Sequence, residues 1–150
     1  MIRCELYTPR CDWSVTVFFA INEYWTDEIM EELWRLGIDA KNAKRAYSNL
    51  LSGELNTGLC YSNYQNRKSV VVVSKTTTAD ELFNSVMHEF KHLSSHIAKA
   101  CGLEETGENI AYATGELAHD MWKYVKHLFC DCCRNKRIDK QNHNHYERED

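Results

Sequence analysis

The sequence predicts an α+β domain with a small, mostly antiparallel sheet packed against helices. Three observations favour this class: one stretch of strict apolar alternation, a pair of short β-rich runs separated by a polar loop, and four stretches of helical periodicity. The 150 residues suffice for one such unit. We expect a single domain over residues 1–133. Residues 134–150 carry both charge signs without apolar periodicity, so we expect a polar C-terminal tail.

The N-terminal half begins with one strand and continues with two helices. The strand is predicted over residues 13–21, where every second residue is apolar. Thr26 is a candidate N-cap for the first helix, and Gly37 ends it. The second helix is predicted from about Ala40 to Ser52, where Gly53 follows as a stop signal.

The middle of the chain predicts a hairpin with strands over residues 59–64 and 69–74. Val70 to Val73 is a continuous β-branched run, which is typical of a strand covered on both faces. Because this strand directly precedes the next helix, we also consider it as an edge that could pair with an extended peptide.

Two long antiparallel helices are predicted to complete the domain. Thr78 and Glu81 have the spacing of a capping box, so a helix should run from there to about Ala100, with Gly102 as its terminator. The last helix is predicted from about residue 106 to about Cys130.

Composition excludes several classes of function. A net charge of -4 and a pI near 6.0 provide no basic field, so we expect no nucleic-acid partner. No apolar run approaches the roughly 20 residues that span a bilayer, and we recognise no signal peptide. Seven cysteines, an odd number without a secretory signal, favour reduced thiols over disulfides. We therefore expect a cytoplasmic protein without membrane contact.

The third helix contains the sequence His88-Glu89-Phe90-Lys91-His92, an H-E-x-x-H pattern. Side chains four residues apart lie one above the other on a helix, so His88 and His92 can converge on one metal ion. Glu89 lies beside the pair and can accept a proton from metal-bound water. All three border the predicted apolar arc of this helix, where a cleft edge is expected. His96 extends the ladder, but we interpret it as a supporting or surface histidine because the ladder rotates by about 40° per step.

A catalytic zinc ion normally takes three protein ligands, so a third must come from elsewhere. Glu108 is our first choice because it borders the apolar arc of the last helix. The segment between His92 and Glu108 is also long enough for the end of one helix, a turn and an antiparallel return. Glu116 and His119 are the alternatives.

A cluster of Cys130, Cys132 and Cys133 stands at the end of the last predicted helix. With His127 before it and His143 and His145 after it, the cluster could bind a second metal, but two C-x2-C pairs are absent. We interpret these cysteines as reduced thiols at a helix end.

The helical part of the sequence resembles the gluzincin group of zinc metallopeptidases. The H-E-x-x-H pattern followed by a downstream helical glutamate carries the resemblance. More narrowly, residues 107–115, with the sequence GENIAYATG, resemble the second helix of small zincin-like proteins of phages and prophages. The likeness spans Val86 to Trp122. It implies that His88, His92 and Glu108 bind Zn²⁺.

The resemblance also implies an activity, that of a small metallopeptidase acting on a peptide or protein substrate with Glu89 as the general base. Tyr112 is a candidate donor to the developing oxyanion, or else a buried tyrosine packed between the two helices. The competing hypothesis is a non-catalytic, zinc-stabilised binding or regulatory domain, in which a metal only ties the two helices together.

Overall fold

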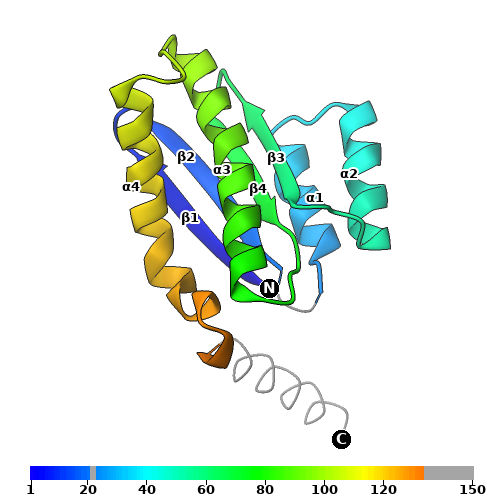
Figure 1. The fold of residues 1–150 in the computed structure, drawn as a ribbon. Helices are drawn as coiled ribbons and strands as arrows, with labels where there is room; N and C mark the ends of the chain where they lie inside the picture. The colour runs from blue at the N-terminus through cyan, green and yellow to red at the C-terminus, as the bar shows by residue number, and fades with distance from the viewer. Residues whose placement is uncertain (21–22, 134–150) are drawn as a thin grey trace, which may run out of the picture.

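The structure, a computed structural model, describes residues 1–20 and 23–133 (Figure 1). Its centre is a four-stranded sheet in the order β1-β2-β4-β3. The pairs β1–β2 and β3–β4 are antiparallel, whereas β2–β4 is parallel. The α+β class with a small, mostly antiparallel sheet is thereby confirmed. The strands are β1 (Ile2–Thr8), β2 (Trp13–Phe19), β3 (Gly58–Asn63) and β4 (Lys68–Val73).

Helices cover both faces of this sheet. They are α1 (Thr26–Arg35), α2 (Ala40–Ser52), α3 (Ala79–Cys101) and α4 (Glu108–Val125), followed by a short 3₁₀ turn, η1 (Lys126–Phe129). One core lies between the sheet and the pair α3 and α4, and it includes Val71 and Val73. The other lies between the sheet and the pair α1 and α2, and it includes Val70 and Val72. Alternate residues of β4 therefore serve opposite cores.

The position of β4 decides between two of our expectations. Val70 to Val73 are all buried, which confirms a strand covered on both faces. Because β4 lies between β2 and β3, the expectation that residues 70–74 form a peptide-pairing edge is wrong. Among the described strands, the edge on this side of the sheet is β3, which packs beside α3 (Figure 1).

The strand β1 is absent from the sequence prediction. Its side chains alternate between buried and exposed from Ile2 to Thr8, so the periodic signal is present. The buried set includes Cys4 and Thr8 as well as Ile2 and Leu6, and this mixture weakens the apolar contrast on which the prediction relies.

Most helix boundaries follow their local signals. The capping box of Thr78 and Glu81 is present at the start of α3, and Gly102 ends that helix with φ +64°. Thr26 is the first residue of α1 and not its N-cap; Trp25 occupies that position without a side-chain hydrogen bond. The last helix is shorter than predicted, because after Val125 the chain tightens into η1.

Some expectations fall outside the part of the chain that the structure describes. These are the extension of the first predicted strand to Ile21 and the C-terminal tail over residues 134–150, which includes His143 and His145. Across the described residues, no helix combines the length and apolar character needed to cross a membrane.

Candidate metal centres

The helix α3 presents His88 and His92 on the same exposed side, one turn apart. Their Nε2 atoms are 3.1 Å apart, and their ring centroids are separated by 4.8 Å. With zinc–nitrogen distances of about 2.0–2.1 Å and tetrahedral angles, two imidazole nitrogens on one ion lie about 3.4 Å apart. The pair therefore fits a shared metal ion with only a small rotation of either ring.

Glu89 is the buried member of the H-E-x-x-H sequence, and only 2% of its surface is exposed. The Thr57 hydroxyl donates a hydrogen bond of 2.8 Å to its Oε1 atom. Gly58 makes this approach possible, because a Cβ atom at residue 58 would lie 2.8 Å from Glu89 Cγ and 2.1 Å from the carbonyl oxygen of Val72. The carboxylate is thus fixed against the start of β3 by a hydrogen bond and by close packing.

These side chains share one pocket of about 420 Å³ beside β3. From α3 the pocket is lined by His88, Glu89, His92 and His96. The β3 side contributes Thr57, Gly58 and Cys60, and α2 contributes Arg45 and Asn49. The structure therefore brings the three H-E-x-x-H residues together at the edge strand of the sheet.

His96 is tied to the sheet by a chain of hydrogen bonds. Its Nδ1 atom lies 2.8 Å from Ser62 Oγ, which lies 2.7 Å from Ser69 Oγ. Ser69 in turn accepts a hydrogen bond of 2.9 Å from the indole nitrogen of the fully buried Trp13. Burial, with smaller contributions from His92 and Lys99, lowers the pKa of His96. These contacts favour a neutral imidazole in a fixed orientation.

Cys60 lies in the same pocket, with its Sγ atom 3.7 Å from His96 Nδ1. Burial raises the pKa of this thiol to about 12, and the neighbouring Glu89 carboxylate adds to the shift. A cysteine nucleophile needs a lowered thiol pKa, so the arrangement does not support a Cys–His catalytic pair. Sequence reasoning missed Thr57, Gly58 and Cys60 as pocket residues, although a glycine at the start of a strand is a sign of close backbone approach.

The structure does not bring Glu108 to the histidine pair. The two helices meet through Ser94 and Thr114, whose hydroxyl oxygens are 2.7 Å apart. Ser94 follows His92 by two residues, which places it about 160° away around the helix axis. No residue of α4 lines the pocket, and Glu108 is exposed at the start of that helix. The predicted third ligand is therefore not among the residues that line the pocket.

The remaining α4 candidates also lie away from the pocket, and Glu116 contacts the end of β1 and the turn that follows it. Glu116 accepts hydrogen bonds from Thr8 at 2.6 Å and from Arg10 at 2.8 Å. The Arg10 guanidinium also lies over the ring of Tyr112 at 4.6 Å from its centroid. Tyr112 is 56% exposed, so it is neither a pocket residue nor buried between the helices. His119 is exposed as well.

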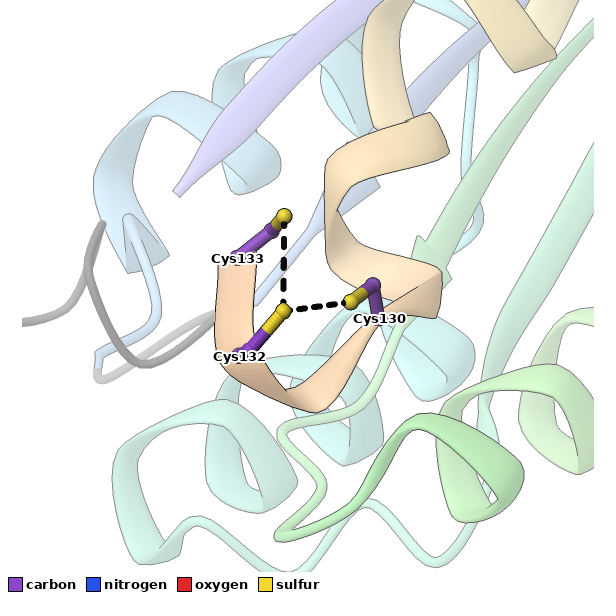
Figure 2. Close-up of side chains that lie close together, drawn as sticks. All are labelled: Cys130, Cys132 and Cys133. Atoms are coloured by element: carbon purple, nitrogen blue, oxygen red, sulfur yellow. Dashed lines mark hydrogen bonds between the residues drawn. The ribbon is translucent and has the colours of Figure 1, made fainter.

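The three clustered cysteines form a second candidate centre (Figure 2). The Sγ atom of Cys132 lies 2.8 Å from that of Cys130 and 3.8 Å from that of Cys133. Within residues 1–20 and 23–133, this is the group of three metal-ligating side chains whose donor atoms all lie within 4.8 Å of one another. The three cysteines are free thiols, as expected, and their arrangement could also hold a metal ion.

Hydrogen bonding gives two thiols of the cluster different pKa values. A bond with Cys132 lowers the pKa of Cys130 to about 7, whereas the same contact raises the pKa of Cys132 to about 11. The shared hydrogen bond therefore makes Cys130 the thiol of this pair that deprotonates more easily.

In comparisons with models of protein families, with curated proteins and with solved structures, nothing matches the chain. What can be said about its chemistry consequently depends on the two centres themselves.

Proposed function

We propose that the chain is a zinc-dependent hydrolase, most specifically a small metallopeptidase, with its centre at His88, Glu89 and His92. The observation that carries this proposal is the placement of Glu89. Burial of a carboxylate that is only 2% exposed costs folding free energy, and such costs are typical of functional sites. Thr57 holds this carboxylate at the wall of the pocket that the two histidines line.

In this proposal the histidines and Glu89 have different roles, which follow from their positions in the pocket. Zinc held by the two imidazoles would supply Lewis acidity and a bound water that ionises near neutral pH. Thr57 occupies Oε1 of Glu89, which leaves Oε2 to accept the proton of the attacking water and return it to the leaving amine. Because the Thr57 bond and the contact with Gly58 fix the carboxylate, it needs no reorientation between the two proton transfers.

A peptide substrate fits the surroundings of the pocket. Among the described strands, β3 is the edge nearest the histidines, and its start lines the pocket. An extended peptide can add to such an edge by main-chain hydrogen bonds and present a scissile carbonyl beside α3. Arg45 and Asn49 of α2 supply polar contacts on the far side of the pocket.

The third protein ligand in this proposal comes from the pocket and not from α4. Three further lining residues have ligating atoms: Glu54, Cys60 and His96. Any of them needs a side-chain movement to join the histidines, since they do not form a three-residue group with them at 4.8 Å.

The test is peptide hydrolysis by the zinc-loaded full chain and by its Glu89→Gln variant, using a mixed peptide library. We expect Glu89→Gln to keep the zinc bound at the histidines and to lose at least about 100-fold in rate, as typical for removal of a general base. Glu105→Gln is the matched control, because Glu105 is an exposed partner of Lys91 at 3.7 Å and should leave the rate unchanged. Wild-type hydrolysis by Glu89→Gln with zinc in place would contradict the mechanism.

A second candidate is a non-catalytic, metal-stabilised binding or regulatory domain. The observation in its favour is that His88 and His92 contribute two donors where a catalytic zinc site has three. A hydroxamate chelator separates the two functions, because it needs open coordination positions. Binding of the chelator to the zinc-loaded chain, lost in His88→Ala, supports the hydrolase; failure to bind supports the non-catalytic domain.

A further inference from the structure

We propose that Cys130, Cys132 and Cys133 form a second metal site, which binds one thiophilic ion through three thiolates independently of the histidine pocket. The site goes beyond the proposed hydrolase, because it shares no residue with the pocket lining.

The sulfur spacing matches a single ion. With zinc–sulfur bonds of about 2.3 Å and tetrahedral angles, two sulfurs on one ion lie about 3.8 Å apart. Cys132 and Cys133 have this separation already, at 3.8 Å. Cys130 and Cys132 are closer, at 2.8 Å, so Cys130 has to turn outward by about 1 Å, which a small change in its side-chain torsion provides.

The segment that carries the cysteines is anchored at Phe129, directly before the cluster, and at Asp131 within it. Phe129 stacks on Trp122 with ring centroids 5.5 Å apart and meets Phe83 edge-on at 6.2 Å. Within the cluster, the Asp131 carboxylate accepts a hydrogen bond of 2.9 Å from the backbone nitrogen of Ala79, at the start of α3. The turn is therefore held in place before any ion binds, which reduces the ordering cost of binding.

Exposure distinguishes this cluster from the other cysteines. All three of its thiols are exposed, whereas Cys4 and Cys11 are buried in the core. The Sγ atoms of Cys130, Cys132 and Cys133 point toward one another (Figure 2). An ion from solvent can reach them without opening the domain.

The donor set selects the class of ion. Three thiolates without a carboxylate favour soft or borderline cations such as Zn²⁺, Cd²⁺ and Cu⁺ over Mg²⁺ or Ca²⁺. Each thiol that is still protonated releases its proton to solvent when its sulfur–metal bond forms, so no oxidant or reductant is consumed.

Binding at this site also affects the helix that carries the histidines. Because Asp131 holds the first residue of α3, an ion bound to the cysteines further stabilises the turn conformation that makes this contact. Any ligand that binds only the folded state raises its stability, so we expect the thermal midpoint of the full chain to rise with the ion.

The experiment titrates the reduced, oxygen-free full chain with Cd²⁺ and records thiolate-to-metal charge-transfer absorbance together with bound metal per chain. We expect the absorbance in the wild type and in the His88→Ala/His92→Ala variant. We expect it to vanish when Cys130→Ser/Cys132→Ser/Cys133→Ser is combined with His88→Ala/His92→Ala. Cys101→Ser, which removes a partly buried thiol outside the cluster, is the matched control and should keep the full signal.

The outcomes separate this site from the proposed function. Loss of one bound Cd²⁺ per chain in the triple serine variant supports the cysteine site. The same metal count and absorbance in the triple variant as in the wild type overturns it. Failure of the reduced wild-type chain to show thiolate-to-metal absorbance on addition of Cd²⁺ also overturns it. Neither result depends on Glu89, so the hydrolase proposal can fail while this site holds.

Discussion

Replacing Gly58 by alanine tests whether Glu89 is held against β3 as the structure places it. The added Cβ atom would lie 2.1 Å from the Val72 carbonyl oxygen and 2.8 Å from Glu89 Cγ. The carbonyl belongs to the buried strand β4 and cannot move aside, so β3 has to shift away and Glu89 has to leave its place.

The magnitude follows from these two displacements. Overpacking of this kind costs about 1–3 kcal/mol, and loss of the Thr57–Glu89 hydrogen bond, which involves a charged acceptor, costs about 1.5–3 kcal/mol. Allowing for partial relaxation, we expect the free energy of unfolding to fall by about 3 kcal/mol. For a chain of this size that corresponds to a decrease of about 6–12 °C in the thermal midpoint.

The assay is urea denaturation followed by circular dichroism, with Gly115→Ala as the matched control. Gly115 lies within α4, and a Cβ atom added to it would meet nothing within 4 Å, so alanine there should stabilise the domain by about 0.5–1 kcal/mol. If Gly58→Ala unfolds within about 0.5 kcal/mol of the wild type while Gly115→Ala behaves as expected, the close approach of Glu89 to β3 is refuted.

Two further predictions concern the surroundings of the two long helices. Trp13→Phe removes the indole donor to Ser69, and we expect a loss of about 1–3 kcal/mol in urea denaturation with zinc binding retained; an unchanged midpoint would contradict the buried bond. Thr8→Val should raise the pKa of Glu116 toward its ordinary value, because the Thr8 hydroxyl, followed by Arg10, lowers it. A lowered folded-state pKa contributes stability that is present above the unfolded value of about 4.3 and is lost as the pH falls through the folded value. NMR titration of the Glu116 carboxyl checks the shift, and an unaltered pKa in the variant would count against it.

The elements that the sequence predicts well are those with local signals. The capping box of α3 and the terminators Gly53 and Gly102 act through hydrogen bonds and dihedral angles within a few residues. The H-E-x-x-H spacing is equally local, and so is the cysteine cluster, where three thiols within four residues converge through one turn. Paired C-x2-C spacing, which the sequence lacks, is not needed for three thiols to converge in a compact turn.

Strand order and strand edges depend on pairing across the chain, and periodicity carries no information about partners. The parallel pairing of β2 with β4 crosses more than one helix, and it places the valine run in the interior. The valine run is itself evidence against an edge strand, because a strand with apolar side chains on both faces is usually central in its sheet. The peptide-binding edge in our proposal therefore moves to β3, whose half-buried side chains from Gly58 to Asn63 fit an exposed strand.

The third ligand is the clearest case in which a helical arc is insufficient. The apolar arc of α4 indicates which residues border the core. It does not indicate whether a bordering residue lies next to α3 or next to the sheet. In the structure, Glu116 and Tyr112 both contact Arg10, which follows β1. We therefore expect Glu108→Gln to bind zinc at the histidine pocket with wild-type affinity, whereas removing a true zinc ligand should weaken binding severely. Competition with a chromophoric chelator measures both, with His88→Ala as the positive control. A weakened affinity in Glu108→Gln would mean that the start of α4 reaches around α3 when metal binds, and it would restore the gluzincin arrangement that the resemblance implies.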